Sequence, residues 1–366
     1  MLAATILLGS LLCGCAGEAG DATNAGDTLL AAPTITTTPA QNGAVVAILA
    51  SATTGATIHY TVDGSAPTEA SQIYEAPFLV ASNLTVKAIA TTGSTVSSMT
   101  SESFAPNIPS GMLVWSDEFN NTTGVKSQPN PQIWTYDNSK FAGGELEDNC
   151  AWGSSLGPCS VASPSEYVGT DGYLHIVAQQ PSAGIYTSAR MKTAGLFSFQ
   201  YGRYEARIKV PEAQGFWPGV WLLGNNSTTV NWPACGEMDV LERVDGPTTP
   251  DTILGSVHGT GFTVGGQLGT IYNFPGGKTA AGWHTYGMIW SKGSVAYYVD
   301  DPTHPYATYT PANLRGITGA VWPFDDGQSS YLLLDLAIGG SWPGSPNATT
   351  PFPSEMLVDY VRVYTN

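Results

Sequence analysis

Positive charge is scarce in this sequence. Its 366 residues include 13 Lys and Arg against 29 Asp and Glu, which gives a formal net charge of −16. Nucleic-acid binding is not expected, because so few cations cannot neutralise a run of phosphates. Charged residues of both signs make up only 11% of the chain while hydrophobic residues make up 42%, so a disordered chain is not expected either. A neutral substrate or ligand fits this composition better.

The N-terminal apolar run is short. The stretch LAATILLGSLLCGC at residues 2–15 cannot cross a bilayer, and it resembles the apolar core of a secretory signal. It ends in a Leu-Cys-Gly-Cys tetrad that resembles a bacterial lipobox, in which Cys15 would be lipidated. We therefore expect a signal peptide of the lipoprotein type at 1–15 and a flexible tether at 16–31. The exported protein would be held at the cell surface or outer membrane only by this lipid; the alternative is an ordinary signal peptide and a secreted protein.

Cysteine and histidine are few. The five His residues show no metal-ligand spacing and no CxxC pair occurs, so transition-metal catalysis is not expected and no cofactor is predicted for catalysis. In an exported chain the remaining Cys residues meet an oxidising compartment. Cys150 and Cys159 flank a Gly/Ser/Pro loop and are predicted to form a disulfide. Cys235 is predicted to be a buried thiol.

A helical apolar period is absent throughout the chain. The 42 Gly and 25 Pro residues favour short strands joined by turns. We therefore predict an all-β protein with a small antiparallel β-sandwich at 32–105, a linker at 106–111 and a larger jelly-roll β-sandwich at 112–366. The larger sandwich would offer a concave sheet face to a chain-like ligand. The smaller one would act as a spacer, with carbohydrate binding as the alternative.

The acidic motif GEMDVLE at residues 236–242 is the strongest local signal. Glu237 and Asp239 are two residues apart and share one face of a strand. One β-bulge before Glu242 would bring this third carboxylate to the same face. Crowding raises the pKa of one member, so that a protonated acid stands beside an ionised carboxylate. Glycosidic-bond cleavage with retention of configuration requires such a pair about 5–5.5 Å apart. The alternative is a solvated, acidic strand edge.

Tryptophan is concentrated just before this motif. Trp217, Trp221 and Trp232 lie within 20 residues before Glu237. Flat aromatic rings commonly stack on the C–H faces of sugars, so these residues are candidates for a saccharide-binding surface. The alternative is ordinary packing in the core.

Nearly all of residues 112–366 resembles glycoside hydrolase family 16, specifically its laminarinase-like endo-β-1,3-glucanases. The motifs that carry the resemblance are VWSDEFN (114–120), DGYLHI (171–176), TSARMKT (187–193), FQYGRYEARIKVP (199–211), FWPGVWLL (216–223), WPACGEMDVLE (232–242), SVHG (256–259), LAIGGSWPG (336–344) and VDYVRVY (358–364). The resemblance implies a concanavalin-A-like fold. The fragment GATIHYTVDGSAPT (55–68) resembles the immunoglobulin-like domain at the end of chitobiases and hexosaminidases.

The resemblance also implies roles for single residues. Glu237 would be the nucleophile, Glu242 the general acid/base, and Asp239 the residue that holds and tunes the nucleophile. The implied sugar contacts are Arg190, Trp217, Trp221, Trp232, His258 and Trp342. Relatives often hold a structural calcium, which suits oxygen ligands, and the matching positions are Glu118, Gly172 and Asp359. The alternative is that no metal binds.

Together these observations predict an exported, monomeric endo-glycanase that cleaves β-1,3-glucan or mixed β-1,3/1,4-glucan with retention. One alternative is a transglycosylase or galactan-active hydrolase of the same family, and another is a catalytically silent glucan-binding lectin. The intact acid triplet argues against the lectin. Residues 1–105 carry a charge of −6, which leaves −10 of the total −16 for the rest of the chain, and this balance argues against a sulfated polymer.

Overall fold

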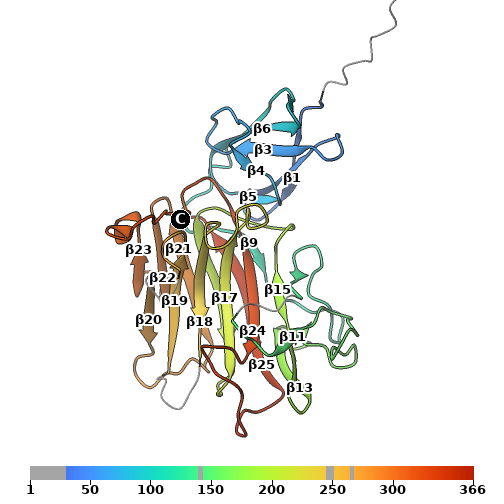
Figure 1. The fold of residues 1–366 in the computed structure, drawn as a ribbon, viewed down its shortest axis with the longest axis vertical. Coiled ribbons are helices and arrows are strands. Elements are labelled where there is room, and N and C mark those ends of the chain that lie inside the picture. Colours follow the sequence, from blue (N-terminus) through green and yellow to red (C-terminus); the bar gives the residue numbers. More distant parts are fainter. Residues whose placement is uncertain (1–29, 139–142, 245–250, 264–267) are drawn as a thin grey trace, which may run out of the picture.

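The computed structural model describes residues 30–138, 143–244, 251–263 and 268–366 (Figure 1). The predicted signal segment and Cys15 lie outside the described residues, so lipidation stays a prediction. Strands make up almost all of the regular structure, and the one described helix is the short 3-10 turn η1 (Pro311–Leu314). Within the described part of the chain, no helix has the length and apolar character needed to cross a membrane. The prediction of an all-β protein is confirmed.

The N-terminal module is a small sandwich of two antiparallel sheets. One sheet has the order β1-β2-β5 and the other the order β4-β3-β6-β7, with β8 paired to β6. The strands are β1 (Thr34–Pro39), β2 (Val45–Ala50), β3 (Thr57–Thr61), β4 (Gln72–Ile73), β5 (Phe78–Val80), β6 (Leu84–Thr92), β7 (Thr95–Val96) and β8 (Thr100–Phe104). Alternate apolar side chains fill the space between the sheets, with Leu49, Tyr60 and Val86 at its centre.

The larger sandwich packs a seven-stranded sheet on a ten-stranded sheet. The first has the order β10 (Thr135–Tyr136), β15 (Arg190–Lys192), β24 (Ser330–Ile338), β17 (Phe216–Gly224), β18 (Glu237–Glu242), β19 (Thr252–His258) and β20 (Gly269–Asn273). The second has the order β11 (Glu147–Asn149), β14 (Ile185–Ser188), β13 (Leu174–Ser182), β25 (Ser354–Tyr364), β16 (Gly202–Lys209), β21 (His284–Ser291), β22 (Ser294–Val299) and β23 (Ala307–Tyr309), with β12 (Glu166–Val168) on β13 and β9 (Leu113–Asp117) on β25.

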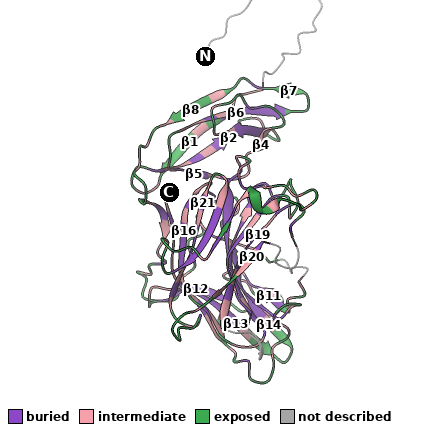
Figure 2. Cartoon of the chain, turned by 90° about the vertical axis from the view of Figure 1, so that its left-hand side faces the viewer, coloured by how far each residue is buried: buried purple, intermediate pink, exposed green. Residues whose placement is uncertain are grey.

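The core of this sandwich lies between the two sheets, which Figure 2 views from the side. Fully buried side chains from both layers meet there, among them Leu222 and Leu334 from the seven-stranded sheet and Tyr204 and Met288 from the other. Because one face of the seven-stranded sheet is used by this core, its opposite face is the one on which polar and aromatic side chains are collected. The jelly-roll prediction is confirmed.

The small module packs directly on one end of the larger sandwich (Figure 1). The Leu79 amide donates to the Ser198 carbonyl at 2.9 Å, and the Ser198 hydroxyl donates to the Pro77 carbonyl at the same distance. Ala44 and Leu79 belong to the buried core cluster of the larger sandwich. Ile108 also packs against this cluster, although it lies in the predicted linker at 106–111. The module is therefore fixed by shared core packing and hydrogen bonds as well as by covalent connection.

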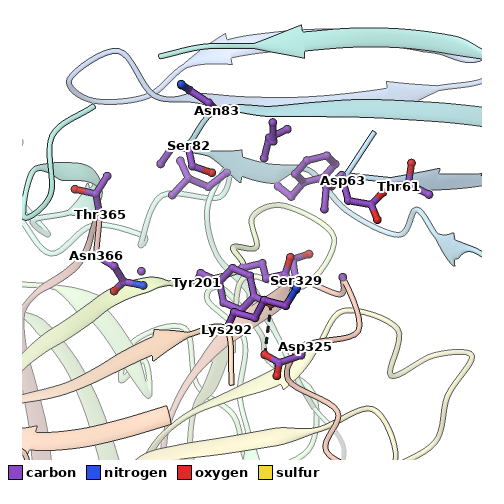
Figure 3. Close-up of a pocket in the computed structure, with 18 of the residues that line it drawn as sticks. Thr61, Asp63, Ser82, Asn83, Tyr201, Lys292, Asp325, Ser329, Thr365 and Asn366 are labelled. Carbon is purple, nitrogen blue, oxygen red and sulfur yellow. Dashed lines mark hydrogen bonds between the residues drawn. The ribbon is translucent and has the colours of Figure 1, made fainter. Parts of the chain in front are cut away.

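A cavity of about 880 Å³ separates the two sandwiches beside this contact. Figure 3 shows Asp63 and Asn83 on the side of the module, with Tyr201, Asp325 and Asn366 on the opposite side. The Tyr201 hydroxyl donates to Asp325 Oδ1 at 3.4 Å and so braces the wall formed by the larger sandwich.

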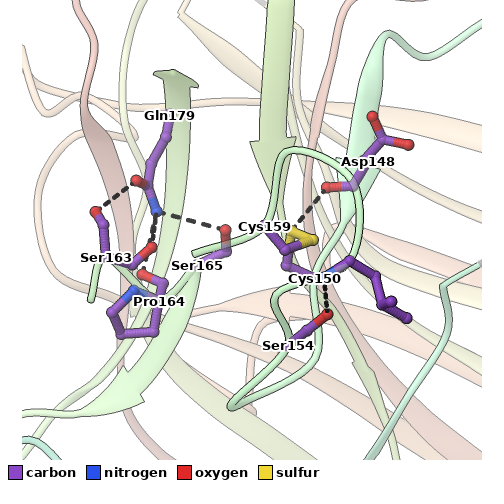
Figure 4. The surroundings of a disulfide bond; sticks show 9 residues. Asp148, Cys150, Ser154, Cys159, Ser163, Pro164, Ser165 and Gln179 are labelled. Carbon is purple, nitrogen blue, oxygen red and sulfur yellow. Dashed lines mark hydrogen bonds between the residues drawn. A yellow bond between two sulfur atoms is a disulfide. The ribbon is translucent and has the colours of Figure 1, made fainter. Parts of the chain in front are cut away.

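Cys150 and Cys159 form a disulfide with a Cα–Cα distance of 5.6 Å (Figure 4). The bond closes the loop that follows β11 at the edge of the ten-stranded sheet. Nearby, the Gln179 amide on β13 donates to the carbonyls of Ser163 and Pro164, both at 3.1 Å. Cys235 is a free, buried thiol, as the sequence predicts.

Shared packing between the two sandwiches predicts a stability effect of Leu79→Ala. Truncation of a buried Leu costs about 2–5 kcal/mol, and Leu79 is packed in the larger core. All 10 Trp residues lie after residue 112, so urea unfolding followed by Trp fluorescence reports on the larger sandwich alone. Leu79→Ala should lower its midpoint, whereas Leu49→Ala, in the module's own core, should lower it less. Equal midpoints for Leu79→Ala and the wild type would contradict the shared core.

Candidate active site

A β-bulge in β18 brings three carboxylates to one face of the seven-stranded sheet. Asp239 pairs with Ser256 and Glu242 pairs with Leu254 on β19, so three residue steps on β18 match two on β19. The register of β18 against β17 shifts at the same place. Val240 is the extra residue, and it is buried in the core with Met238 and Leu241. The bulge predicted from the ExDxxE spacing is therefore present.

Pairing across the sheet arranges the site in rows, because directly opposed residues point to the same face. One row contains Glu237 and His258, and the next contains Trp221, Asp239 and Ser256. A third row runs across four strands and consists of Arg190, Asp335, Gly219 and Glu242. A fourth row includes Trp217 of β17. The acids therefore lie in the middle of the sheet, with aromatic side chains of β17 beside them.

Asp239 is the hub of the hydrogen bonds in this cluster. It is only 3% exposed, and its Oδ2 accepts from Ser256 Oγ at 2.5 Å and from His258 Nε2 at 2.9 Å. His258 Nε2 lies 3.8 Å from Glu237 Oε1. The Thr263 carbonyl, 3.2 Å from His258 Nδ1, fixes the ring from its other side. The imidazole therefore connects the first two carboxylates.

Glu242 lies between Trp217 and Ser256. Its Oε1 accepts from the Trp217 indole nitrogen at 3.2 Å, and its Oε2 lies 3.5 Å from the Ser256 hydroxyl, which also donates to Asp239. Gly219 stands directly opposite Glu242 on β17, and the Trp221 indole packs over this glycine. The Glu242 carboxyl group is therefore held by Trp217.

Burial and mutual repulsion set the protonation of the cluster. Burial raises the pKa of Glu242 to about 8, and the charge of Asp239 acts in the same direction. Burial and Asp239 also raise the pKa of Glu237, while the charge of His258 acts against this rise. Burial alone would lower the pKa of His258, but its bond to Asp239 raises the pKa to about 9. At neutral pH the cluster therefore holds a cationic imidazole and a protonated Glu242.

Two exposed tryptophans stand on opposite sides of the acids. Trp232, 50% exposed, has its ring centroid 6.2 Å from that of His258. Trp342, 45% exposed, lies edge-on to Trp217 at 5.4 Å. Trp221 is half-buried between them, and its indole nitrogen donates to Asp335 Oδ1 at 2.9 Å. Such rings suit stacking on sugars, so the structure brings the predicted tryptophans together around one face.

Two residues of the site, Ser256 and Asp335, were missed by the sequence reasoning. Ser256 lies two residues before His258 on one strand, so alternation alone places it on the acidic face. Asp335 is the lone carboxylate in the apolar run YLLLDLAIG, which is itself a signal, because a charge is rarely buried without a partner. Its partner is Arg190, whose Nε donates to Asp335 Oδ2 at 3.3 Å.

The side chains at two of the three predicted calcium positions, Glu118 and Asp359, form ion pairs. Both carboxylate oxygens of Glu118 accept from Arg362, at 2.9 and 2.7 Å. Asp359 Oδ2 accepts from Arg207 at 2.5 Å, and Gly172 lies in the turn before β13. The predicted site uses backbone oxygens and one acid, and these ion pairs leave the backbone carbonyls and the second Asp359 oxygen available, so calcium binding stays a prediction. Calcium therefore enters no step below.

One group of side chains in the described ranges could approach a single cation, namely Glu237, Asp239 and His258, whose ligand atoms lie within 4.8 Å of one another. The His258 imidazole already bridges the two carboxylates. A hydrogen-bonded imidazolium neutralises the carboxylates as a cation would, so the cluster is best explained by acid–base chemistry.

Two glutamates and an aspartate crowded on one sheet face, with the pKa of Glu242 raised to about 8 and tryptophans beside them, form the arrangement that glycosidic-bond cleavage requires. The sequence profile described as "Glycosyl hydrolases family 16" matches residues 160–362. The chain belongs to this family. A second profile, "Fn3 associated", matches residues 46–104, which is compatible with the immunoglobulin-like module.

Similar proteins agree with this family. The chain is 33% identical to "Glucan endo-1,3-beta-glucosidase A1" of Niallia circulans over 282 residues, which is 71% of this chain and 38% of that protein. It is also 33% identical to "Beta-glucanase" of Rhodothermus marinus, over 70% of this chain and 86% of that protein. Among solved structures, the laminarinase catalytic domain from Thermotoga maritima superposes with a TM-score of 0.59 at 33% identity, covering 70% of this chain and 99% of that domain.

The hydrogen bond from Ser256 to Asp239 can be tested by mutation. Ser256→Ala removes the 2.5 Å bond to Asp239, and a hydrogen bond to a charged group contributes about 1.5–3 kcal/mol. We expect kcat/KM to fall by about tenfold or more, with an unchanged midpoint of thermal unfolding within a few degrees. Ser116→Ala, which removes an acceptor for the Gln41 amide far from the acids, is the matched control. Equal kinetics for both variants would contradict this assignment.

Proposed function

We propose that the protein is an endo-acting hydrolase of β-1,3-glucan, or of mixed β-1,3/1,4-glucan, that works with retention of configuration. The observation that carries the proposal is the β18 cluster itself, in which one bulge brings Glu237, Asp239 and Glu242 to one sheet face. Glu242 has a pKa of about 8 and is held by Trp217, so it is prepared to give a proton. Burial raises the pKa of Glu237 as well, and the imidazolium of His258 opposes this rise and stabilises a negative charge on Glu237.

The geometry supports a double displacement. Glu242 gives its proton to the leaving glycosidic oxygen while Glu237 attacks the anomeric carbon, so the glycosidic bond breaks and a glycosyl–Glu237 ester forms. Ionised Glu242 then takes a proton from water, whose oxygen attacks the same carbon and releases Glu237. Asp239 bonds to His258 at 2.9 Å and so keeps the imidazolium 3.8 Å from the Glu237 carboxylate. Because two inversions occur at one carbon, the product keeps the original configuration.

The position of the exposed tryptophans supports cleavage within a polymer. Trp232 approaches His258 next to Glu237, and Trp342 approaches Trp217 next to Glu242. Sugar residues can therefore stack on both sides of the reacting bond, as an endo-acting enzyme requires. The names of the relatives from Niallia circulans and Thermotoga maritima support a β-1,3-glucan as this polymer.

The charge of the site supports a neutral polymer. The acidic face carries Glu237, Asp239 and Asp335, and the cations His258 and Arg190 are bonded to Asp239 and Asp335. A sulfated galactan would meet cations that already have carboxylate partners, which disfavours its binding. The same argument does not separate one neutral linkage from another, so linkage is decided by products.

Product analysis on four polymers tests this proposal. The wild type should release oligosaccharides of several lengths from laminarin and none from agarose or κ-carrageenan, while lichenan defines the breadth for mixed linkages. Glu237→Gln should lose at least about 10⁴-fold in kcat, because the covalent step disappears, yet still bind laminarin. Glu102→Gln, an exposed position of the small module, is the control. Turnover by Glu237→Gln would contradict the nucleophile assignment, and retention on a glucan column without any product would favour a lectin.

The pH dependence of kcat/KM tests the role of Glu242. The acid must carry a proton, so activity is present below its pKa and should be lost as the pH rises through about 8. In Glu242→Ala, azide should restore turnover of a substrate with a good leaving group, because the anion attacks the anomeric carbon of the glycosyl–Glu237 intermediate directly, forms a glycosyl azide and needs no general base. The alkaline loss should then disappear. An alkaline limb that persists in the rescued variant would assign this titration to another group.

A further inference from the structure

Asp335 is a buried carboxylate on the sheet face that carries the acids, and the mechanism above does not use it. It is 6% exposed and lies on β24, next to the catalytic half of the sheet. Arg190 stands directly opposite it on β15, and Gly219 stands opposite it on β17. Glu242 is the next residue of the same row. Directly opposed residues share a face, so Asp335 faces the same side as the acid.

Both oxygens of Asp335 are engaged by residues predicted to contact the sugar. Oδ1 accepts from the Trp221 indole at 2.9 Å, and Oδ2 accepts from Arg190 Nε at 3.3 Å. The Arg190 side chain is itself only 3% exposed. A buried ion pair contributes little to the stability of the fold. The role that we assign to this pair is to hold the Arg190 and Asp335 side chains in position.

Gly219 leaves the space that this arrangement needs. A Cβ atom at this position would lie 2.6 Å from Asp335 Oδ1 and 3.3 Å from Trp221 Cδ1. Any side chain there would separate the carboxylate from the indole or displace both. Gly219 is also the residue between Asp335 and Glu242 in their row of the sheet, and it contributes no side chain there.

We propose that Asp335 is a positioning residue of the active site: it fixes the Trp221 ring and the Arg190 guanidinium on the sheet face that carries the acids, in the same row as Glu242. The inference rests on the proposed function for its consequence in turnover. Its structural content, the two hydrogen bonds and the charge, does not depend on which polymer is cleaved.

Several charges act on Glu242 from the strands packed around it. Asp239 and Asp335 favour its protonated form, while the imidazolium of His258 opposes this effect. Arg190 lies behind Asp335 and offsets part of its charge. Replacing Asp335 by Asn removes one negative charge from the row that contains Glu242, and this change favours ionised Glu242. The variant should therefore give up the Glu242 proton at a lower pH.

Indole N–H signals provide a measurement that needs no substrate. Trp217 donates to Glu242 and Trp221 donates to Asp335. In protein labelled with ¹⁵N in its tryptophans, the Trp217 signal therefore reports the protonation of Glu242. The Trp221 signal reports the contact with Asp335. In Asp335→Asn we expect the pH midpoint of the Trp217 signal to fall by about one unit. The Trp221 signal should shift at every pH.

A charge-preserving variant separates position from charge. Asp335→Glu keeps the carboxylate but moves it by one methylene, so the Trp217 midpoint should stay near that of the wild type while the Trp221 signal shifts. Its kcat/KM on laminarihexaose should fall by about 10–100-fold, because a displacement of about 1 Å in a positioning group has this effect. If Asp335→Asn does not fold, Asp335→Glu and Gly219→Ala carry the test, since Gly219→Ala leaves every charge in place and should also shift the Trp221 signal.

Glu205→Gln is the matched control, because Glu205 is a buried carboxylate on β16 that pairs with Arg203 and accepts from Tyr298 at 2.7 Å. It should change neither indole signal. An unmoved Trp217 midpoint in Asp335→Asn, or Asp335→Glu kinetics equal to those of the wild type, would overturn the inference. A wild type that cleaves none of the polymers would overturn the proposed function instead, since the indole titrations stand apart from turnover.

Discussion

The extra residue in β18 is the constraint on which the site depends. An unbroken strand would place Glu237 and Glu242 on opposite faces, because five residues separate them. Val240 takes up the surplus residue and turns inward to the core. Its burial among the side chains of the sandwich therefore opposes slippage of the bulge. The reactive face is held by the apolar core behind it, which explains why catalytic geometry can be encoded on a regular sheet.

Charge compensation is the second constraint. Four carboxylates, those of Glu237, Asp239, Glu242 and Asp335, share one face of a mostly apolar sandwich, where isolated charges are costly. Protonation relieves part of this repulsion, and His258 and Arg190 relieve the rest. The same groups also serve the chemistry. The proton retained by Glu242 makes it an acid, and the imidazolium of His258 is a counter-charge for the nucleophile Glu237. The crowded carboxylates thus lower the stability of the folded protein, and packing of the surrounding strands compensates for this cost.

The sequence allowed the acid cluster to be predicted, since alternation and one bulge relate residues that are close along the chain. The β-sandwich class followed in the same way from strand-like runs without a helical period. Partners distant in sequence were beyond that reasoning. Arg190 and Asp335 are 145 positions apart, and their contact depends on the order of strands in the sheet, which periodicity does not specify. The packing of Leu79 in the core of the larger sandwich could not be predicted either, because the strand pattern of the small module does not show which of its residues contact the neighbouring sandwich.

Burial of Leu79 and Ala44 in the larger core limits how this architecture can be rearranged. Modules joined by a bare linker can be exchanged between enzymes as cassettes, because neither half contributes to the other's interior. Here a graft of the catalytic half alone would expose an apolar patch and leave the Ser198 carbonyl without the amide that it accepts. An exchange that cuts between the two sandwiches would therefore need polar replacements on the surface that Ala44 and Leu79 cover.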